Sequence, residues 1–523
     1  MHKEIQITLP PEKVNNKSVL EKEIIKIINI EIQQITRWRI IRKSIDARSY
    51  LPKFNLSVEV YWDEIPPEDT AYNFHYNFVG NKPSVLIIGS GPAGLFAALK
   101  LIELGLKPVI LERGKQIKQR KKDIASICRN EGIDPNSNYC FGEGGAGTFS
   151  DGKLYTRSKK RGDKLHVLQV FHHHGANENI LYEAQPHIGS DKLPLIVENI
   201  CKTIIDCGGE IHFETRITDI LLKNGHITGC KTADNNIFEA ASLILATGHS
   251  ARDVYEMLYH QGILLENKGF AMGVRVEHPQ QLIDSIQYHK KYRGDFLPPA
   301  NYQLVEQVEG RGVYSFCMCP GGHIVPAGSG TKEIVVNGMS ASKRNSPFAN
   351  SGIVVEIKPE DIPSDFSGCG PLASLMFQKH LEKLAYINNG GLNLTAPAQR
   401  LTDFVNGKLS DNLPTCSYLP GLISSPLHFW MPDFLTKRLQ EGFKKFDKKM
   451  HGFLTREAVI VGVESRSSSP IRIPRDKETY QHPQIKGLFP CGEGSGYAGG
   501  ITSSALDGEN AAIAVYKSRL YHN

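Results

Sequence analysis

The residues best suited to chemistry in this chain lie in one glycine-rich segment. Gly89, Gly91 and Gly94 form the pattern Gly-x-Gly-x-x-Gly directly after the apolar run 84–88, and Glu112 follows 23 residues after Gly89. A strand, glycine turn and helix at this spacing present backbone N–H groups to a pyrophosphate, and a terminal acid binds ribose hydroxyls. The segment therefore predicts a dinucleotide-binding site.

Each glycine of this pattern has a different physical task. Gly89 permits the tight turn, Gly91 lets the backbone approach the pyrophosphate, and Gly94 lets the helix pack closely on the strand. Pro92 lies in the first helical turn, where its missing N–H is tolerated. The acid Glu112 argues against a 2′-phosphate, which leaves FAD or NAD. The predicted contacts are these five residues together with Ala93 and Arg113.

Two later segments favour FAD, because they resemble motifs of two-dinucleotide-type flavoproteins. Residues 243–251, LILATGHSA, resemble the second nucleotide-side motif of those proteins, and residues 487–512 resemble their closing flavin motif. The resemblance implies that Glu493 meets the ribityl or pyrophosphate region. It also implies that the following helix points its N-terminus at the flavin N1–C2 edge, where negative charge develops on reduction. The implied contacts are Ala246, Thr247, Gly248, Gly492, Glu493, Gly499, Gly500, Ile501 and Thr502.

A further glycine-rich segment lies about 30 residues past Glu112. Residues 142–154, GEGGAGTFSDGKL, would by themselves be equally compatible with a surface loop. Beside the other motifs, they predict a loop whose backbone lies against the flavin and the pyrophosphate. The expected contacts are Gly144, Gly145, Gly147 and Thr148.

The resemblance extends over nearly the whole chain, from residue 42 to residue 509. The chain is similar to a bacterial group of FAD-dependent dehydrogenases, also called NAD(P)/FAD-dependent oxidoreductases, of uncharacterised substrate. This similarity implies FAD binding and oxidoreductase activity, and it supplies no substrate. The matching stretches are RKSIDARS (42–49), EGGAGTFSDGKLYTR (143–157), PHIGSDKLP (186–194), ATGHSARD (246–253), FCMCPGGHIVPAGS (316–329), VNGMSASKRNSPFANSGIVV (336–355), GVESRSSSPIRI (462–473) and GEGSGYAGGITSSALDGE (492–509).

A parallel α/β sheet has to position these motifs. The succession of strand, glycine turn, helix and strand from Ser84 predicts a Rossmann-type α/β domain. A helix at 193–207 and strands near 210–214, 215–223, 226–232 and 243–246 continue it. Before it, strands at 4–9, 33–48 and 54–62 and a helix at 17–29 predict a small α+β module. We expect four segments: the module (1–75), the first part of a discontinuous FAD domain (81–264), an inserted α+β substrate domain (265–454) and the closing part of the FAD domain (455–523), with a turn-rich linker at 66–83.

Composition narrows the class of protein. With 523 residues, 40% of them hydrophobic and 22% charged, the chain can bury a core that needs no disulfide or metal. The formal net charge of +6 is compatible with an anionic ligand and does not indicate nucleic acid. Ten irregularly spaced cysteines and a charged, leaderless beginning predict reduced thiols and a cytoplasmic location. The apolar stretch 84–106 is interrupted by four glycines, a proline and Lys100, so we expect no membrane span.

Several other groups are weaker candidates for a site. Cys317 and Cys319 invite a metal or redox interpretation, but zinc needs about four ligands, so packing is favoured and no metal is expected. His172–His174 is interpreted as a solvated helix end, and the basic run 113–122 as a solvated helix face. Arginine presents a planar fork to carboxylates and phosphates, so the candidate substrate contacts are Arg466, Arg472 and His323, with His249 and Arg252 of lower weight.

These patterns lead to a flavin dehydrogenase or reductase that passes a hydride between FAD and a small organic substrate. There is no C-x4-C pair and no second Gly-x-Gly-x-x-Gly after a strand, so NAD(P)H or another electron partner would bind transiently. A flavin monooxygenase remains an alternative, as does a sensor or interaction protein with FAD as a structural ligand. RNA modification rests on the charge balance alone. No nucleic-acid or membrane partner is expected, and the catalytic residues, the substrate and the oligomeric state stay open.

Overall fold

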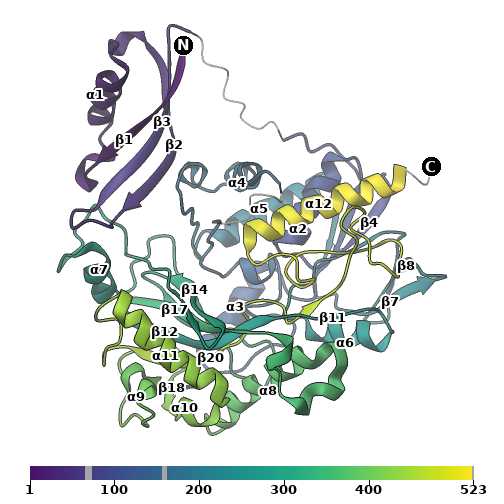
Figure 1. Ribbon diagram of the computed structural model, residues 1–523. Helices are drawn as coiled ribbons and strands as arrows, with labels where there is room; N and C mark the ends of the chain where they lie inside the picture. The colour runs from purple at the N-terminus through teal and green to yellow at the C-terminus, as the bar shows by residue number, and fades with distance from the viewer. Residues whose placement is uncertain (65–73, 156–161, 521–523) are drawn as a thin grey trace.

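The apolar run Ser84–Ile88 forms β4, the middle strand of a five-stranded parallel sheet in the computed structural model, which describes residues 1–64, 74–155 and 162–520 (Figure 1). The strand order is β22-β10-β4-β5-β6, with every pairing parallel. Its central strands are buried on both faces, as parallel sheets require. The expected Rossmann-type fold is confirmed. The other strands are β5 (Lys107–Leu111), β6 (Glu210–His212), β10 (Leu243–Leu245) and β22 (Leu488–Pro490).

Helices cover one face of this sheet, and a helix with a small sheet covers the other. α2 (Pro92–Glu103), α4 (Lys164–His173), α5 (Leu193–Asp206) and α12 (Ile501–Leu520) share one hydrophobic cluster with the sheet. α6 (Arg252–His260) and the antiparallel sheet of β7 (Ile217–Lys223), β8 (His226–Thr232) and β9 (Ile237–Glu239) share the cluster on the opposite face. α3 (Ile117–Cys128) carries residues 117–122 of the basic run, and the expected solvated face is wrong at Arg120, which is fully buried and donates to backbone carbonyls. Figure 1 shows α12 lying along α2 although 400 residues separate them.

Glycines allow two close backbone approaches, one between α2 and the turn before it and one between α2 and α12. A Cβ on Gly94 would lie 1.9 Å from the carbonyl oxygen of Gly89, and one on Gly508 would lie 2.1 Å from that of Ala93. Gly89 itself has φ +102°, which side chains disfavour. The predicted turn and packing roles of Gly89 and Gly94 therefore agree with the structure. The close crossing at Gly508 was not anticipated.

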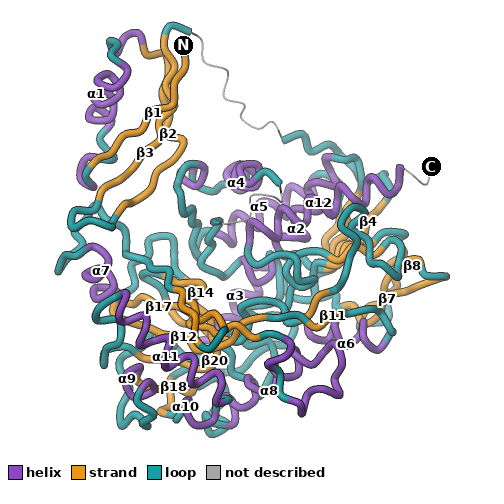
Figure 2. The backbone as a smooth tube through the Cα atoms, in the orientation of Figure 1, coloured by secondary structure: helices purple, strands orange, loops and turns teal. Residues whose placement is uncertain are grey.

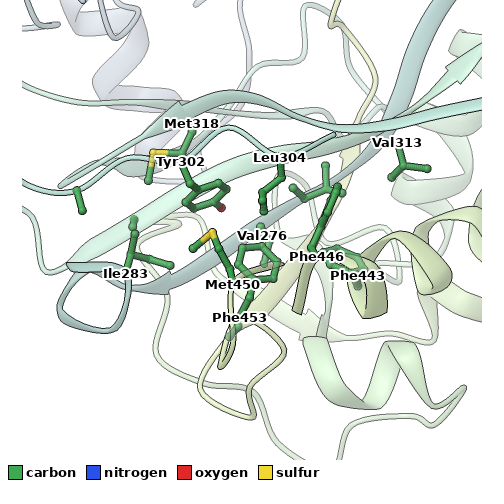
Figure 3. Packing of buried hydrophobic residues seen from close by; sticks show 14 of the residues in the cluster. Val276, Ile283, Tyr302, Leu304, Val313, Met318, Phe443, Phe446, Met450 and Phe453 are labelled. Carbon is green, nitrogen blue, oxygen red and sulfur yellow. The ribbon is translucent and has the colours of Figure 1, made fainter. Parts of the chain in front are cut away.

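A second sheet forms the inserted domain. Its seven strands follow the order β13-β14-β17-β12-β20-β18-β19, and its core joins α7, α9 and α11, including the aromatic and sulfur-containing side chains in Figure 3. Figure 2 shows the strands β12, β14, β17 and β20 of this sheet apart from α2, α5 and α12, the helices that cover the parallel sheet. The elements are β12 (Phe270–Pro279), α7 (Gln280–Tyr288), β13 (Val305–Val308), β14 (Arg311–Cys319), β15 (His323–Pro326), β16 (Val336–Met339), β17 (Phe348–Ile357), α8 (Ala373–Ile387), β18 (Ala396–Arg400), α9 (Leu401–Val405), β19 (Leu422–Ser424), α10 (Leu427–Trp430), α11 (Asp433–Lys449) and β20 (Val459–Glu464).

The predicted return to the FAD domain at residue 455 is wrong. β20 pairs with β12 and β18 of the seven-stranded sheet, so the chain returns only after it. β21 (Ile471–Arg472) then pairs with β11 (Glu266–Asn267), where the insertion began. The run Val459–Glu464 is buried throughout, and a continuous apolar run does not reveal which of two sheets it joins.

The N-terminal segment has a sheet and a helix of its own, and its buried side chains belong to the same cluster as those of the inserted domain. β1 (His2–Leu9), β3 (Lys53–Trp62) and β2 (Ile35–Asp46) form an antiparallel sheet with α1 (Lys17–Ile28) on one face. It projects from the rest of the molecule in Figure 1. Of the expected linker 66–83, residues 66–73 lie outside the described residues, while Val79 is buried against the FAD domain.

The remaining expectations concern single residues. All ten cysteines are free. His172 and His173 are exposed at the end of α4 as expected, but His174 is buried and its Nδ1 contacts the carbonyl of Val170 at 2.7 Å. Among the described residues, no helix is both long enough and apolar enough to cross a membrane.

The close crossing of α2 and α12 yields a first prediction. Gly508→Ala places a methyl group against the backbone of Ala93, so we expect a loss of about 1–3 kcal/mol in unfolding free energy. Urea unfolding measures it. The control is Gly368→Ala, where the added Cβ meets open space and no loss is expected. Equal midpoints for the two variants would contradict the packing argument.

A second prediction concerns buried histidine. Burial lowers the pKa of His278 from 6.5 to about 4. Its Nε2 donates to the Phe453 carbonyl at 2.8 Å, and its Nδ1 has no hydrogen-bond partner among the described residues. The unfolded chain binds the proton more readily between these values, so stability falls as pH drops from 6.5 to 4. Relative to His278→Gln, the wild-type protein should lose about 3 kcal/mol more between pH 7 and pH 4 in urea titrations. Parallel pH profiles would refute this assignment.

Candidate functional site

One cavity of about 420 Å³ lies between the carboxyl ends of β4, β10 and β22 and a wall of the inserted domain formed by β14 and the two-stranded sheet of β15 and β16. Ligands of open α/β sheets bind at this end of the strands. Its wall contains residues from all four predicted nucleotide segments, so the structure brings distant motifs together. The predicted residues that line it are Gly89, Gly91, Pro92, Ala93, Glu112, Arg113, Gly145, Gly147, Ala246, Thr247, Gly248, Gly492, Glu493, Gly499, Gly500 and Ile501.

Two helix N-termini open onto this cavity. α2 begins at Pro92 and α12 at Ile501, and both residues line the wall. Between them lies Gly147, whose Cβ, if present, would be 3.2 Å from Pro92 Cγ and 3.6 Å from Ile501 Cγ1. The free N–H groups and positive dipole ends of both helices therefore converge, an arrangement that stabilises anions.

Several wall glycines leave room that a side chain would fill. A Cβ on Gly248, Gly499 or Gly500 would meet no atom within 4 Å, and one on Gly91 would meet only Gly145 Cα at 3.9 Å. All four residues line the cavity, so their bare backbones face it directly. This glycine-lined cradle with two helix N-termini fits the pyrophosphate and flavin of FAD.

The carboxylate of Glu112 has a role that the sequence did not reveal. One oxygen accepts hydrogen bonds from the backbone N–H and the hydroxyl of Ser90, at 2.9 and 2.8 Å. The other accepts from the backbone N–H groups of Gly114 and Gly142, both at 2.9 Å. These four donors match the four acceptor positions of a carboxylate. Glu112 thus ties the glycine turn to the 142–154 loop, and its predicted contact with ribose stays a prediction that requires the Ser90 hydroxyl to turn away.

Charged side chains surround this end of the cavity. Arg113 Nη1 donates to Asp253 at 2.9 Å, and its guanidinium lies 4.2 Å from the ring centroid of Phe141. Arg216 reaches the other oxygen of Asp253 at 3.3 Å. Asp253, Phe141 and Arg216 line the cavity but were not among the predicted contacts. No spacing relates them to the glycine pattern, so the sequence offered no signal for them.

Four predicted cofactor residues do not line the cavity. Gly94 packs helix against turn, in its predicted role. Thr148 is buried and donates to the Glu143 carbonyl at 2.8 Å, and a Cβ on Gly144 would meet Thr148 Oγ1 at 1.9 Å. Thr502 is also buried and donates to the Leu154 carbonyl at 2.7 Å. Gly144, Thr148 and Thr502 therefore support the loop and the start of α12 from outside the cavity lining, and their contact with the cofactor stays a prediction.

The wall that belongs to the 142–154 loop carries an ion pair. Lys153 Nζ lies 2.9 Å from buried Asp151, which Arg344 approaches at 3.5 Å. Burial alone would lower the pKa of Lys153, but Asp151 together with the sulfur atoms of Cys319 and Cys317 raises it. Asp151 is held ionised in return, because Lys153 and Arg344 lower its pKa against the effect of burial. Burial lowers the pKa of the nearby His187 to about 4. The wall therefore presents a permanent cation to the cavity.

Opposite the helix ends, the seven-stranded sheet closes the cavity around one fully buried arginine. Arg275 on β12 donates to Glu464 at 3.0 Å and to Asn337 and Asn350, both at 3.1 Å. Its Nη atoms also lie 3.4 and 3.3 Å from the carbonyl oxygen of Cys317. Cys317 and Asn337 line the cavity. Burial raises the pKa of Glu464 to about 7, against the opposing charge of Arg275.

Only one of the three predicted substrate contacts lines the cavity. Arg466 does so, yet its guanidinium already pairs with Glu333 at 2.7 Å and with Glu382 at 3.0 Å. It therefore belongs to a buried ion-pair network, the structural alternative to substrate binding. Arg472 on β21 is half-exposed and His323 on β15 is exposed, and neither lines the cavity, so this cavity lends their predicted substrate contact no support.

Of the two remaining candidates for substrate contact, His249 lines the cavity and Arg252 does not. His249 lines the cavity, with Nδ1 3.4 Å from Glu493. Arg252 instead donates to Glu382 at 2.6 Å within the Arg466 network. Across residues 1–64, 74–155 and 162–520, no group of three or more His, Cys, Asp or Glu side chains is placed to hold a metal.

Comparison with protein-family models gives three consecutive matches. Residues 83–271 match a model described as pyridine nucleotide-disulphide oxidoreductase. Residues 269–467 match one described as FAD-dependent protein, C-terminal domain-like, which includes β20 and so agrees with the corrected boundary. Residues 1–61 match a domain of unknown function.

A full-length relative exists in Clostridium beijerinckii. It is named only as an uncharacterized protein and is 39% identical over 514 residues, covering 95% of both chains. Solved structures are more distant. A flavin-dependent brominase is 14% identical with a TM-score of 0.38, over 83% of this chain and 78% of that one. A geranylgeranyl bacteriochlorophyll reductase-like protein of Thermoplasma acidophilum is 13% identical with a TM-score of 0.35, over 84% and 80%. TM-scores this low do not establish a shared architecture.

The four hydrogen bonds to Glu112 yield the third prediction. Glu112→Gln replaces two acceptor positions by an amide that donates, so either the glycine turn or the 142–154 loop loses its anchor. We expect FAD to bind about tenfold or more weakly, measured as the 450 nm absorbance retained after dialysis. Glu239→Gln, exposed on β9, is the control. Wild-type retention of FAD by Glu112→Gln would show that the anchor is dispensable.

Proposed function

Because this chain belongs to the family of FAD-dependent proteins that includes the Clostridium beijerinckii relative, we propose that it passes a hydride between FAD and a small organic substrate. FAD is the cofactor of this family of oxidoreductases. The observation that carries the proposal is the continuity of one cavity. It runs from the glycine cradle to a wall of charged and polar side chains that no nucleotide motif requires, among them Lys153, Cys317 and Asn337.

The chain itself offers what FAD binding needs. The bare backbones at Gly91, Gly499 and Gly500 and the two helix N-termini would hold the pyrophosphate and the flavin. Arg113 and Phe141 would flank the nucleotide at the Glu112 end. When bound, FAD supplies the hydride acceptor or donor, and the protein binds, orients and tunes.

Lys153 is the residue best placed to act on a substrate. Its ammonium group is fixed by Asp151 at 2.9 Å, lines the cavity and keeps its proton. A fixed cation in a wall of low dielectric constant can bind a carboxylate or stabilise negative charge that develops on a carbonyl oxygen. Asp151 also lines the cavity, but its carboxylate is taken up by Lys153 and Arg344, so it acts through Lys153. Asn337 adds a polar group held in place by Arg275.

Anaerobic reduction tests the proposal. The holoprotein is reduced by dithionite and mixed in a stopped-flow instrument with a panel of quinones, carbonyl compounds and enoates, and the oxidised form with NADH, NADPH and small alcohols. We expect at least one compound to change the flavin redox state far faster than the buffer control. If no donor or acceptor does so, FAD is a structural or sensing ligand and the proposal fails.

Substitution of Lys153 gives the fourth prediction. With whichever compound reacts, Lys153→Met should lower kcat/KM by about 10²–10³-fold, as the removal of one preorganised donor does. Lys437→Met, on the exposed face of α11, is the matched control and should behave like the wild type. The FAD content of each variant is measured first, so that loss of cofactor is not counted as loss of rate. Equal kcat/KM values would remove Lys153 from the reaction.

A further inference from the structure

Two cysteines on β14 lie at the cavity, and the proposed hydride transfer uses neither of them. Cys317 is exposed and lines the cavity, whereas Cys319 is fully buried behind it. Lys153 Nζ lies 3.5 Å from Cys319 Sγ, so the cation of the wall also contacts a thiol. Both cysteines therefore share one environment with the residue that we place against the substrate.

The backbone between these cysteines is distorted. β14 pairs with β17 through Phe316 and Gly352, and pairing resumes only at Cys319 and Asn350, so β14 carries one extra residue. Cys317 has φ +48°, in the left-handed region. This conformation costs a residue other than glycine about 1–2 kcal/mol. Strained backbone of this kind is concentrated at active sites and ligand-binding sites. Bulges of this kind re-aim side chains beside active sites.

Specific contacts hold the distortion in place. Two Nη atoms of Arg275 contact the carbonyl oxygen of Cys317 at 3.4 and 3.3 Å, and Cys319 Sγ donates to the same oxygen at 3.2 Å. The Cys319 sulfur thus rests against the backbone of Cys317. The contacts preserve a conformation in which one thiol faces the cavity and the other lies directly behind it.

The spacing of the two residues permits a disulfide bond. A strand advances about 3.3 Å per residue, so their Cα atoms are at most about 6.6 Å apart, and a bulge shortens that distance. Disulfides form when Cα atoms are about 4.4–6.8 Å apart. Since Cys319 Sγ already touches the Cys317 backbone, side-chain rotation can bring the two sulfur atoms together.

The two thiols differ in their access to the cavity. Burial raises the pKa of both, to about 12 for Cys319, and for Cys317 the charges of Lys153 and then Arg275 offset part of the rise. Cys317 is the thiol exposed to the cavity, so it is the one that can exchange its proton there and attack.

We propose that Cys317 and Cys319 form a redox-active dithiol that exchanges one electron pair with the bound flavin. In the oxidative direction the Sγ–Sγ bond forms, two S–H bonds break, and FAD takes up the electron pair and two protons to become FADH2. The reverse reaction reopens the disulfide. The inference rests on the proposed function, since it requires FAD in the cavity, and it gives the holoprotein a second two-electron centre.

The number of electrons that the oxidised holoprotein takes up provides the fifth prediction. The holoprotein is oxidised with a thiol-specific diazene, desalted and titrated anaerobically with dithionite. The wild type should take up four electrons per bound FAD, and Cys317→Ser and Cys319→Ser two. The control Cys369→Ser, in a residue outside the cavity lining, should take up four. An uptake of two electrons by the wild type overturns the dithiol, while the flavin still titrates normally and leaves the proposed function intact.

A second measurement needs neither a variant nor enzymatic activity. The oxidised wild type is denatured and alkylated with N-ethylmaleimide, and its mass is determined. The sample is then reduced and alkylated again, and the mass is determined a second time. Eight of the ten cysteines should be labelled before reduction and all ten after it. The peptide that contains Cys317 and Cys319 should be two hydrogen atoms lighter and carry no label. Full labelling of the oxidised protein, or a disulfide at other cysteines, overturns the proposal.

Discussion

The structure around the cavity depends on one carboxylate. Glu112 accepts four hydrogen bonds from three positions in the chain: the Ser90 turn, Gly114 after β5, and Gly142 at the start of the glycine-rich loop. It is buried, and a buried carboxylate is tolerated only when its acceptor positions are filled. The same interaction therefore sets the turn that starts α2 and the loop that ends at Lys153. The cradle and the reactive wall are thus connected through a single side chain.

Arg275 has the corresponding role in the inserted domain. It is buried, and its partners come from β14, β16, β17 and β20. A single guanidinium thus fixes the strained Cys317 carbonyl and the Asn337 side chain at the cavity. Glu112 and Arg275 lie in different domains. Each forms hydrogen bonds from a charged side chain to backbone groups beside the cavity and so fixes the conformation of that backbone. A planar fork with five donors suits this task in a way that lysine does not.

Local patterns allowed the nucleotide half of the site to be predicted, because its rules act over few residues. Gly89, Gly91 and Gly94 follow one another at fixed spacing, and the structure places them as expected. Spacing could not show that Glu112 has its acceptor positions filled, nor that Thr502 turns into the core. Nor could it place β20, because a uniformly apolar strand suits either sheet. The reactive wall depends on side chains that meet only after both sheets have formed.

The crossing of α2 and α12 also bears on how the protein is made. α2 begins at Pro92 and α12 at Ile501, so the two helices that meet at Ala93 and Gly508 are synthesised about 400 residues apart. At about 5–20 residues per second, the ribosome needs roughly 20–80 s to travel from one to the other. Throughout that interval the earlier helix lacks its partner and its apolar surface remains open to chaperones and to other nascent chains. FAD that binds afterwards contacts both the segment of the domain that is synthesised first and the segment that is synthesised last. FAD binding therefore requires that both segments have been translated.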